Sequence, residues 1–176
     1  DVLRSFYIET IDLCHRLDKE TSGCLVFAKN KIALRFFNKN LALRDKDLKK
    51  TYIAILKGNF KKELLIDSNI NTTKSSIDHK VNLNSQEGKY ASSLFRPIKK
   101  LNKSSLVEID IFSGRTHQIR VQAESLKHNV ANDIKYGDVE FNKFISKSGI
   151  KSMALHAKSI KFIDEDSNLI QVEAPL

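Results

Sequence analysis

The stretch SLVEIDIFSGRTHQIR, residues 105–120, predicts the strand and the helix around which the fold is organised. Apolar and acidic residues alternate over 105–112, as in a half-buried strand with its apolar side chains on one face. Ser113 and Gly114 end this strand in a turn. A helix is expected after the turn, with Thr116 near its start and an apolar side that faces the core. That side consists of Ile119, Ala123 and Leu126.

Other apolar segments extend this pattern toward both ends of the chain. Strands are expected at 24–28 (CLVFA), 51–56 (TYIAIL), about 154–163 and about 169–174. An amphipathic helix is expected over about 31–43, capped by Asn30 and with an apolar face of Ile32, Leu34, Phe36, Phe37 and Leu41. The polar stretch 61–90 predicts only short strands and loops. Because strands dominate without regular helix alternation, the predicted fold class is α+β, with a mixed, largely antiparallel central sheet and flanking helices in one domain, 1–176.

The composition favours a polyanionic partner. The 176 residues include 30 Lys and Arg against 21 Asp and Glu, a formal net charge of +9, which favours nucleic acid. A protein that is basic only for solubility is the alternative. No apolar run approaches the length that crosses a bilayer, and Cys14 and Cys24 are too few for a disulfide framework or a zinc site. A cytoplasmic protein without membrane contact is therefore expected.

A charged loop, HRLDKETSG at 15–23, precedes the first predicted strand. Loops that lead into core strands commonly carry catalytic groups. Arg16 and Lys19 flank Asp18, which favours an ionised carboxylate that can act as a nucleophile or a base. A surface loop whose charges pair with one another has the same composition, so the loop alone leaves both interpretations open.

A second cluster, GRTHQIR at 114–120, lies where the predicted strand turns into the helix. Helix starts attract anions, and Arg115 and His117 add donors there. Arg120 lies one turn beyond Thr116 on the same side and can grip a carboxylate or phosphate with two hydrogen bonds. A helix cap followed by solvated arginines is the alternative.

Tyr52, in the strand predicted at 51–56, is either a core residue or a ring on which a base stacks. His156, near the end of the chain, is by itself more often structural than catalytic. The five histidines lack metal-ligand spacing, and the sequence has neither a glycine-rich phosphate loop nor a dinucleotide fingerprint. Ser22 does not stand in the turn motif of a serine hydrolase. No metal and no organic cofactor are therefore predicted.

Taken together, these stretches resemble the RluA-type RNA pseudouridine synthase family, in the family's order and over nearly the whole chain. The matching stretches are HRLDKETSG (15–23), KTYIAILKG (50–58), IFSGRTHQIRV (111–121), MALHAKSIKF (153–162) and VEAPL (172–176). Two more, SQEGKYASSLF (85–95) and NDIKYGDVEFN (132–142), are most similar to the RluC branch, whose members modify large-subunit ribosomal RNA. The resemblance implies an α+β catalytic domain that needs no cofactor and converts uridine to pseudouridine in that RNA. A monomer is expected, because nothing in the sequence demands a dimer.

The resemblance also assigns roles to individual residues. Asp18 matches the catalytic carboxylate, with three routes open: attack at C1′ of the sugar, attack at C6 of the base, or removal of a sugar proton to give a glycal. Arg120 matches the arginine that pairs with it, and Tyr52 matches the tyrosine that stacks on uracil and assists removal of the C5 proton. Arg16 matches the residue that fills the gap left by the flipped nucleotide. The residues expected to bind RNA or substrate are His15, Arg16, Arg115, His117, Gln118 and Leu155.

Some positions depart from the family pattern. Gln122 stands where a histidine is usual, and Lys127-His128-Asn129 stands where Gly-His-Pro is frequent. The family's N-terminal strand, the small S4-type domain and the C-terminal helix are absent, so a catalytic domain truncated at both ends is expected. Two other functions compete with the synthase. One is a non-catalytic RNA-binding ribosome assembly factor with a synthase-like fold, and the other is a nucleosidase or glycosidase that uses Asp18 with Glu20 as the second carboxylate.

Overall fold

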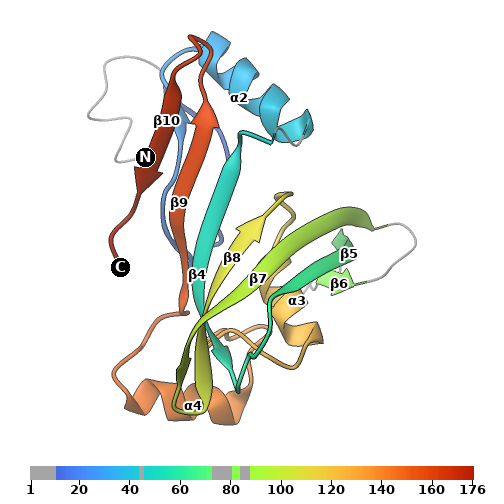
Figure 1. The fold of residues 1–176 in the computed structure, drawn as a ribbon, viewed down its shortest axis with the longest axis vertical. Coiled ribbons are helices and arrows are strands. Elements are labelled where there is room, and N and C mark those ends of the chain that lie inside the picture. Colours follow the sequence, from blue (N-terminus) through green and yellow to red (C-terminus); the bar gives the residue numbers. More distant parts are fainter. Residues whose placement is uncertain (1–10, 44–45, 73–80, 84–87) are drawn as a thin grey trace.

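The computed structural model describes residues 11–43, 46–72, 81–83 and 88–176, which form one long sheet, a small two-stranded sheet and helices beside them (Figure 1). The strands of the large sheet lie in the order β10-β9-β4-β8-β7-β5-β6, and β2 adds to the edge of β9. The elements are β1 (Asp12–Leu13), β2 (Ser22–Gly23), β3 (Phe27–Ala28), α2 (Lys31–Leu43), β4 (Lys49–Lys57), β5 (Leu64–Thr72), β6 (Val81–Leu83), β7 (Lys89–Leu101), β8 (Ser104–Ile111), α3 (Gln118–Ser125), α4 (Val139–Lys147), β9 (Leu155–Ile163) and β10 (Leu169–Glu173).

The sheet is antiparallel except for β2, which pairs in parallel with β9 in the described part of the chain. The predicted α+β class with a mixed, largely antiparallel sheet is therefore confirmed. The expected strands at 51–56, 154–163 and 169–174 correspond to β4, β9 and β10. The stretch 61–90 is more regular than expected, because β5 alone extends over nine residues and pairs with β7 along its length.

The prediction of a strand at 24–28 is wrong. Only Phe27–Ala28 is a strand, and Leu25 is 39% exposed. The cause is a change of partner, because Gly23 pairs with β9 whereas Phe27 pairs with Leu13 of β1. A chain that moves from one sheet to another within four residues cannot form one continuous strand.

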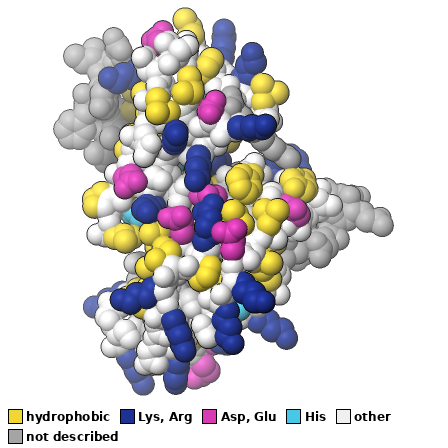
Figure 2. All heavy atoms as spheres, viewed as in Figure 1, with side chains coloured by type: hydrophobic (Ala, Val, Ile, Leu, Met, Phe, Trp, Pro, Cys, Tyr) yellow, Lys and Arg dark blue, Asp and Glu magenta, His cyan; other side chains and the backbone are white. Residues whose placement is uncertain are grey.

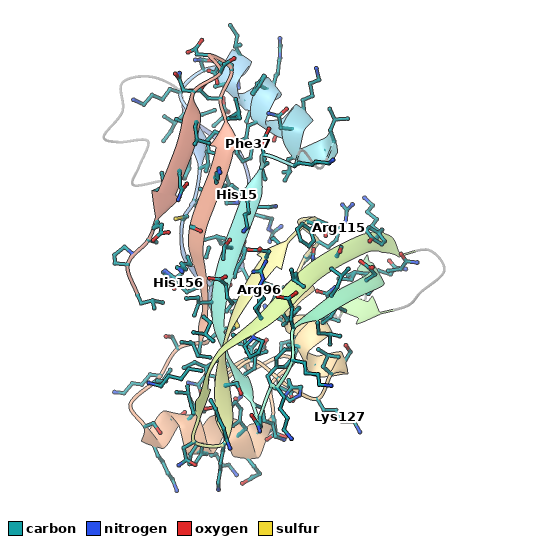
Figure 3. The ribbon with its side chains drawn as sticks, in the orientation of Figure 1. His15, Phe37, Arg96, Arg115, Lys127 and His156 are labelled. Atoms are coloured by element: carbon teal, nitrogen blue, oxygen red, sulfur yellow. The ribbon has the colours of Figure 1, made fainter. Side chains whose placement is uncertain are left out.

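The helix expected over 31–43 is α2, and Asn30 caps one of the free backbone N–H groups of its first turn, as predicted. The side-chain oxygen of Asn30 accepts a hydrogen bond from the backbone N–H of Ala33 at 2.8 Å. Phe37 is buried on its inner face and stacks on the ring of His15 (Figure 3). Ile32 was expected on that face but is 70% exposed, because it lies on the side of the helix that faces solvent.

The strand expected at 105–112 is β8, and it is buried more deeply than its alternation predicts. Val107 and Ile109 lie fully buried in the main core. Asp110 on the opposite face is only 2% exposed, because Arg96 and Lys49 both pair with its carboxylate. Figure 2 shows this face, where cationic and acidic side chains alternate over the middle of the sheet. Ion pairs between cationic and acidic side chains thus cover the second face of β8.

The helix that follows β8 is α3, which begins at Gln118 and buries Ile119 and Ala123 in the core as expected. The later helix α4, which lies at one end of the molecule in Figure 1, had no counterpart among the sequence predictions. Its start is capped by Asp138, and it buries Phe141. No helix in the described ranges combines the length and the apolar character needed to cross a membrane.

Candidate active site

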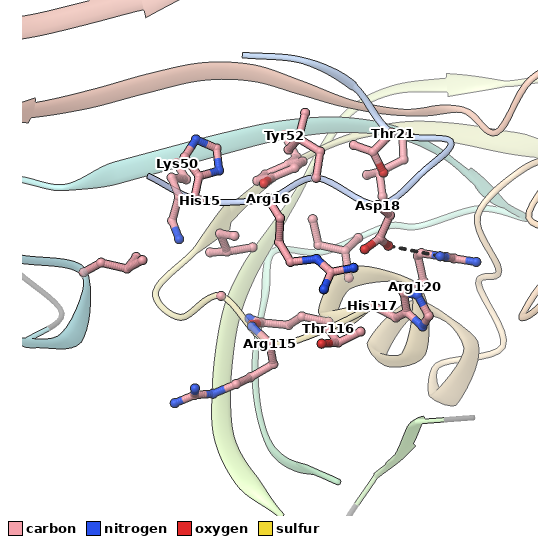
Figure 4. Close-up of a pocket in the computed structure, with 17 residues that line it drawn as sticks. His15, Arg16, Asp18, Thr21, Lys50, Tyr52, Arg115, Thr116, His117 and Arg120 are labelled. Carbon is pink, nitrogen blue, oxygen red and sulfur yellow. Dashed lines mark hydrogen bonds and ion pairs between the residues drawn. The ribbon is translucent and has the colours of Figure 1, made fainter. Parts of the chain in front are cut away.

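One pocket gathers all the residues that the sequence singled out for chemistry or binding (Figure 4). It is bounded by the loop 15–21, the first half of β4 and the segment from β8 into α3. The predicted residues that line it are His15, Arg16, Asp18, Tyr52, Arg115, His117, Gln118, Arg120 and Leu155. Residues from four separate parts of the sequence therefore meet at one place, and their individual roles stay predictions.

Arg120 is the centre of this arrangement and bonds to two carboxylates at once. One terminal nitrogen donates to Oδ2 of Asp18 at 3.0 Å, across 102 positions of the sequence. Nε and the other terminal nitrogen donate to the two oxygens of Asp133, at 2.7 and 2.9 Å. The two bonds to Asp133 therefore hold the orientation of the guanidinium plane, and the remaining terminal nitrogen donates to Asp18.

Asp133 is the main residue of the site to which the sequence analysis assigned no role. Its side chain has 0% exposure, and it also accepts hydrogen bonds from the backbone N–H groups of Lys135 and Tyr136. Burial acts to raise the pKa of Asp133, but the hydrogen bonds from Arg120 and from these backbone groups outweigh it, so the pKa lies below its usual value. Likewise, burial acts to lower the pKa of Arg120, but Asp133 and Asp18 raise it overall.

The loop that carries Asp18 is held against β9 by Gly23. This glycine has φ +110°, and a Cβ atom there would lie 2.2 Å from the carbonyl oxygen of Ala157. The next residue, Cys24, donates its N–H to that same oxygen at 2.8 Å. Only glycine permits this approach. Asp18 itself closes a turn, because its carbonyl accepts from the N–H of Thr21 at 3.0 Å, and its side chain is directed toward α3.

The start of α3 is fixed by the amide of Gln118, which is buried. Its oxygen accepts from Ser113 Oγ at 2.7 Å and from the backbone N–H of Arg115 at 3.1 Å. Its nitrogen donates to the carbonyl of Ser92 at 3.0 Å and to Oγ of Ser93 at 2.7 Å. Because these bonds occupy both ends of the amide, the geometry favours a positioning role for Gln118 over direct contact with RNA through its side chain.

His117 precedes this helix in the left-handed conformation, with φ 55°. Its Nδ1 lies 2.9 Å from the hydroxyl of Tyr136, whose ring also lies 5.0 Å from the guanidinium carbon of Arg120. Burial lowers the pKa of His117, although Asp18 acts in the opposite direction. A neutral imidazole beside Asp18 is therefore favoured at neutral pH.

Tyr52 and Leu155 form the apolar side of the pocket, and both are less than 10% exposed. Burial raises the pKa of Tyr52 to about 12, with a smaller contribution from the charge of Asp18. The phenol is therefore neutral over the physiological range. A flat apolar wall next to a carboxylate is a suitable place for a planar base.

The three remaining predicted residues lie around the opening. Arg16 is exposed and extends over the pocket, whereas Arg115 is half-buried and donates from Nε to the carbonyl of Tyr90 at 3.1 Å. His15 accepts from the N–H of Val26 at 3.2 Å and so ties the loop to the next segment. Burial, and then the charge of Lys50, lowers the pKa of His15.

Comparison with known proteins agrees with this geometry. Residues 3–125 match the model of a family described as RNA pseudouridylate synthase. The chain belongs to this family. A relative from Vibrio cholerae, called ribosomal large subunit pseudouridine synthase C, is 34% identical over 94% of this chain and 52% of its own length. The protein of that name from Escherichia coli K12 is 32% identical over 94% of this chain and 53% of its own length. The chain thus spans about half the length of the curated relatives that it matches.

Solved structures give the same fold. The structure of human RNA pseudouridylate synthase domain containing 1 superimposes with a TM-score of 0.80 at 25% identity, over 95% of this chain and 69% of that one. A second human structure, domain containing 4, is 23% identical and has a TM-score of 0.75 over 94% of this chain and 71% of its own. The family assignment and the fold therefore agree.

The buried pair of Arg120 and Asp133 predicts a stability effect. Asp133→Asn removes the charge from a fully buried partner of Arg120, and we expect the free energy of unfolding in urea to fall by about 3 kcal/mol at neutral pH. Because the pKa of Asp133 is lowered in the folded state, its contribution is present above the unfolded value of about 4 and is lost as the pH falls through the folded pKa. The difference between variant and parent should therefore shrink in acid.

Asp166→Asn is the matched control, because Asp166 is exposed in the turn between β9 and β10. It should cost less than about 0.5 kcal/mol. Equal losses for the two variants would contradict the structural role of Asp133.

Proposed function

We propose that this chain converts specific uridines of large-subunit ribosomal RNA into pseudouridine, with Asp18 as the catalytic carboxylate. The observation that carries the proposal is the Asp18 side chain, which is 17% exposed, paired with Arg120, and turned into a pocket with an apolar wall and a cationic rim. Family membership and the names of the relatives support it. The net charge of +9 suits an RNA partner.

The reaction is an isomerisation. The bond between N1 of uracil and C1′ of ribose breaks, the base turns, and a bond forms between C5 and C1′. The C5 proton leaves and N1 gains a proton, so that no oxidant, reductant or net water is consumed. Asp18 supplies the carboxylate oxygen that starts this sequence, and the hydrogen bond from Arg120 holds that carboxylate directed at the substrate.

The target nucleotide must leave its helix, because C1′ and C5 cannot both be reached while the base is stacked. Tyr52 and Leu155 receive the flipped base on the apolar side of the pocket. Arg16, exposed above the pocket, takes the space that the nucleotide leaves. Arg115 and His117 hold the backbone at the rim. The protein acts on RNA in the cytoplasm as a monomer in this proposal.

The competing functions fit the pocket less well. A glycosidase needs a second carboxylate, but Glu20 is exposed and Asp18 is the one acidic residue among the described residues that line the pocket. The carboxylate of Asp133 is buried and engaged by Arg120. A factor that only binds RNA has no use for a carboxylate among phosphate-binding cations. Both points favour the synthase.

Asp18→Asn should abolish the reaction while leaving the fold intact. Large-subunit ribosomal RNA transcribed without modification is incubated with the parent or the variant, and new pseudouridines are mapped by chemical labelling. We expect new sites with the parent and a rate at least about 1000-fold lower with the variant, because a neutral amide cannot replace the carboxylate. Glu20→Gln, two positions away, should retain the parental rate, and substantial turnover by Asp18→Asn would refute the assignment.

Tyr52→Phe distinguishes the role of the ring from that of the hydroxyl, because it removes the hydroxyl and keeps the ring. The ring still stacks on the base, so RNA affinity should stay within about twofold of the parent. The hydroxyl assists removal of the C5 proton in our proposal, so kcat should fall about 100-fold. Because the pKa of Tyr52 is raised to about 12, the pH–rate profile between about pH 6 and pH 9 should keep its shape. An unchanged kcat would exclude a role for the hydroxyl.

A further inference from the structure

A lysine at the other end of the pocket has no place in the proposed chemistry so far. Lys50 is the second residue of β4 and is only 6% exposed, although lysines are among the residues least often buried. Its ammonium lies 3.4 Å from the carbonyl oxygen of Ser113, and no carboxylate in the described part of the chain pairs with it. One long hydrogen bond does not satisfy a buried charge with three donors.

The charges that face Lys50 increase this imbalance. Arg115, on the segment after β8, adds a positive charge that acts on Lys50, and His15, on the loop before β2, supplies no negative charge to offset it. Burial, and then the charge of Arg115, lowers the pKa of Lys50 to about 8. Asp18, the pocket's acidic residue among those described, is bonded to Arg120 at the opposite end (Figure 4). Among the described residues, the end of the pocket that holds Lys50 is therefore positive and without a counter-ion of its own.

The ammonium lies beneath the loop after β8, next to Gly114, and borders the pocket. A Cβ atom at Gly114 would lie 3.4 Å from Nζ of Lys50, so that any longer side chain at this position would extend over the ammonium. Gly114 itself is exposed. A ligand in the pocket can therefore reach Lys50 next to Gly114, on the same side of the pocket as Arg115.

We propose that Lys50 and Arg115 form a phosphate subsite that binds a backbone phosphate of the substrate RNA next to the flipped uridine. The inference rests on the proposed function, because it takes RNA as the ligand. A phosphate neutralises the buried ammonium and accepts the paired N–H groups of an arginine, which removes the electrostatic cost that the free pocket bears. The subsite and the Asp18–Arg120 pair then hold the nucleotide from its two ends.

This subsite makes RNA binding depend on pH in a defined window. Lys50 binds phosphate in its protonated form, so affinity should fall as the pH rises above about 8. Among the other titratable groups that line the pocket, the pKa values of His15 and His117 are lowered, that of Tyr52 is about 12, and the arginines stay charged. Lys46 and Lys49 border Lys50 on its other side and add further positive charge there. A bound phosphate raises the pKa of Lys50, so the RNA complex retains the proton that the free protein loses.

The test measures the Kd for unmodified large-subunit ribosomal RNA in an Asp18→Asn background, where no turnover interferes. Salt is varied from about 50 to 300 mM, and pH from about 7 to 9.5. We expect Lys50→Met to weaken binding about tenfold near pH 7, to reduce the slope of log Kd against log salt by about 0.7–0.9, and to remove the decline above pH 8. Lys50→Arg should keep the parental slope and show a flat pH profile, because its charge does not titrate.

Lys147→Met is the control, since Lys147 is exposed in the last turn of α4, and it should retain the pH-dependent decline. A Lys50→Met protein with the parental slope and profile would overturn the subsite, as would a parental Kd that is constant across the pH window. If Lys50→Met does not fold by circular dichroism, the profile of Lys50→Arg decides the question. Failure of the synthase function is a separate result, because it would appear as a lack of pseudouridine with the unaltered chain.

Discussion

The site depends on one guanidinium group that two carboxylates share. Arg120 is 8% exposed, and burying its charge would be unfavourable without partners on both sides. Asp133 accepts from two of its nitrogens and Asp18 accepts from the third, so the position of the proposed catalytic carboxylate follows from that of the arginine. Two other contacts of the site support this one. The close approach of Gly23 to β9 holds the loop of Asp18, and the amide of Gln118 holds the start of α3, which carries Arg120.

The long sheet supplies the rigidity that such a contact needs. β4 and β8 pair over eight residues, and their buried faces share one core with α3. Catalytic groups on short loops keep their geometry when the elements beneath them cannot move. The pocket has two distinct ends: the ion pair of Asp18 and Arg120 lies at one end, and Lys50 and Arg115 lie at the other (Figure 4). In the proposed complex, a nucleotide that spans them is held at its reacting carbon and at its phosphate.

Local patterns predicted much of this molecule. Helix α2 and strands β4, β8, β9 and β10 followed from periodicity, and the family resemblance brought Asp18, Tyr52 and Arg120 into one site. Contacts between residues far apart in the sequence could not be predicted from such local patterns. Asp133 matters because the chain before α4 folds back onto Arg120, and Lys50 is buried because the loop after β8 covers it; neither fact leaves a local signal. The segment 24–28 was mistaken for a strand because an apolar run does not reveal that its two ends pair with different sheets.

The most direct test of the central contact is the single-turnover rate of pseudouridine formation by Arg120→Lys on unmodified large-subunit ribosomal RNA. Lysine keeps the positive charge but lacks the planar fork that bonds to both carboxylates. The account predicts a folded variant whose rate falls about 100-fold, equivalent to about 2.7 kcal/mol of lost transition-state stabilisation. A rate within about twofold of the parent would mean that charge alone suffices, and it would contradict the account that the shared guanidinium positions Asp18.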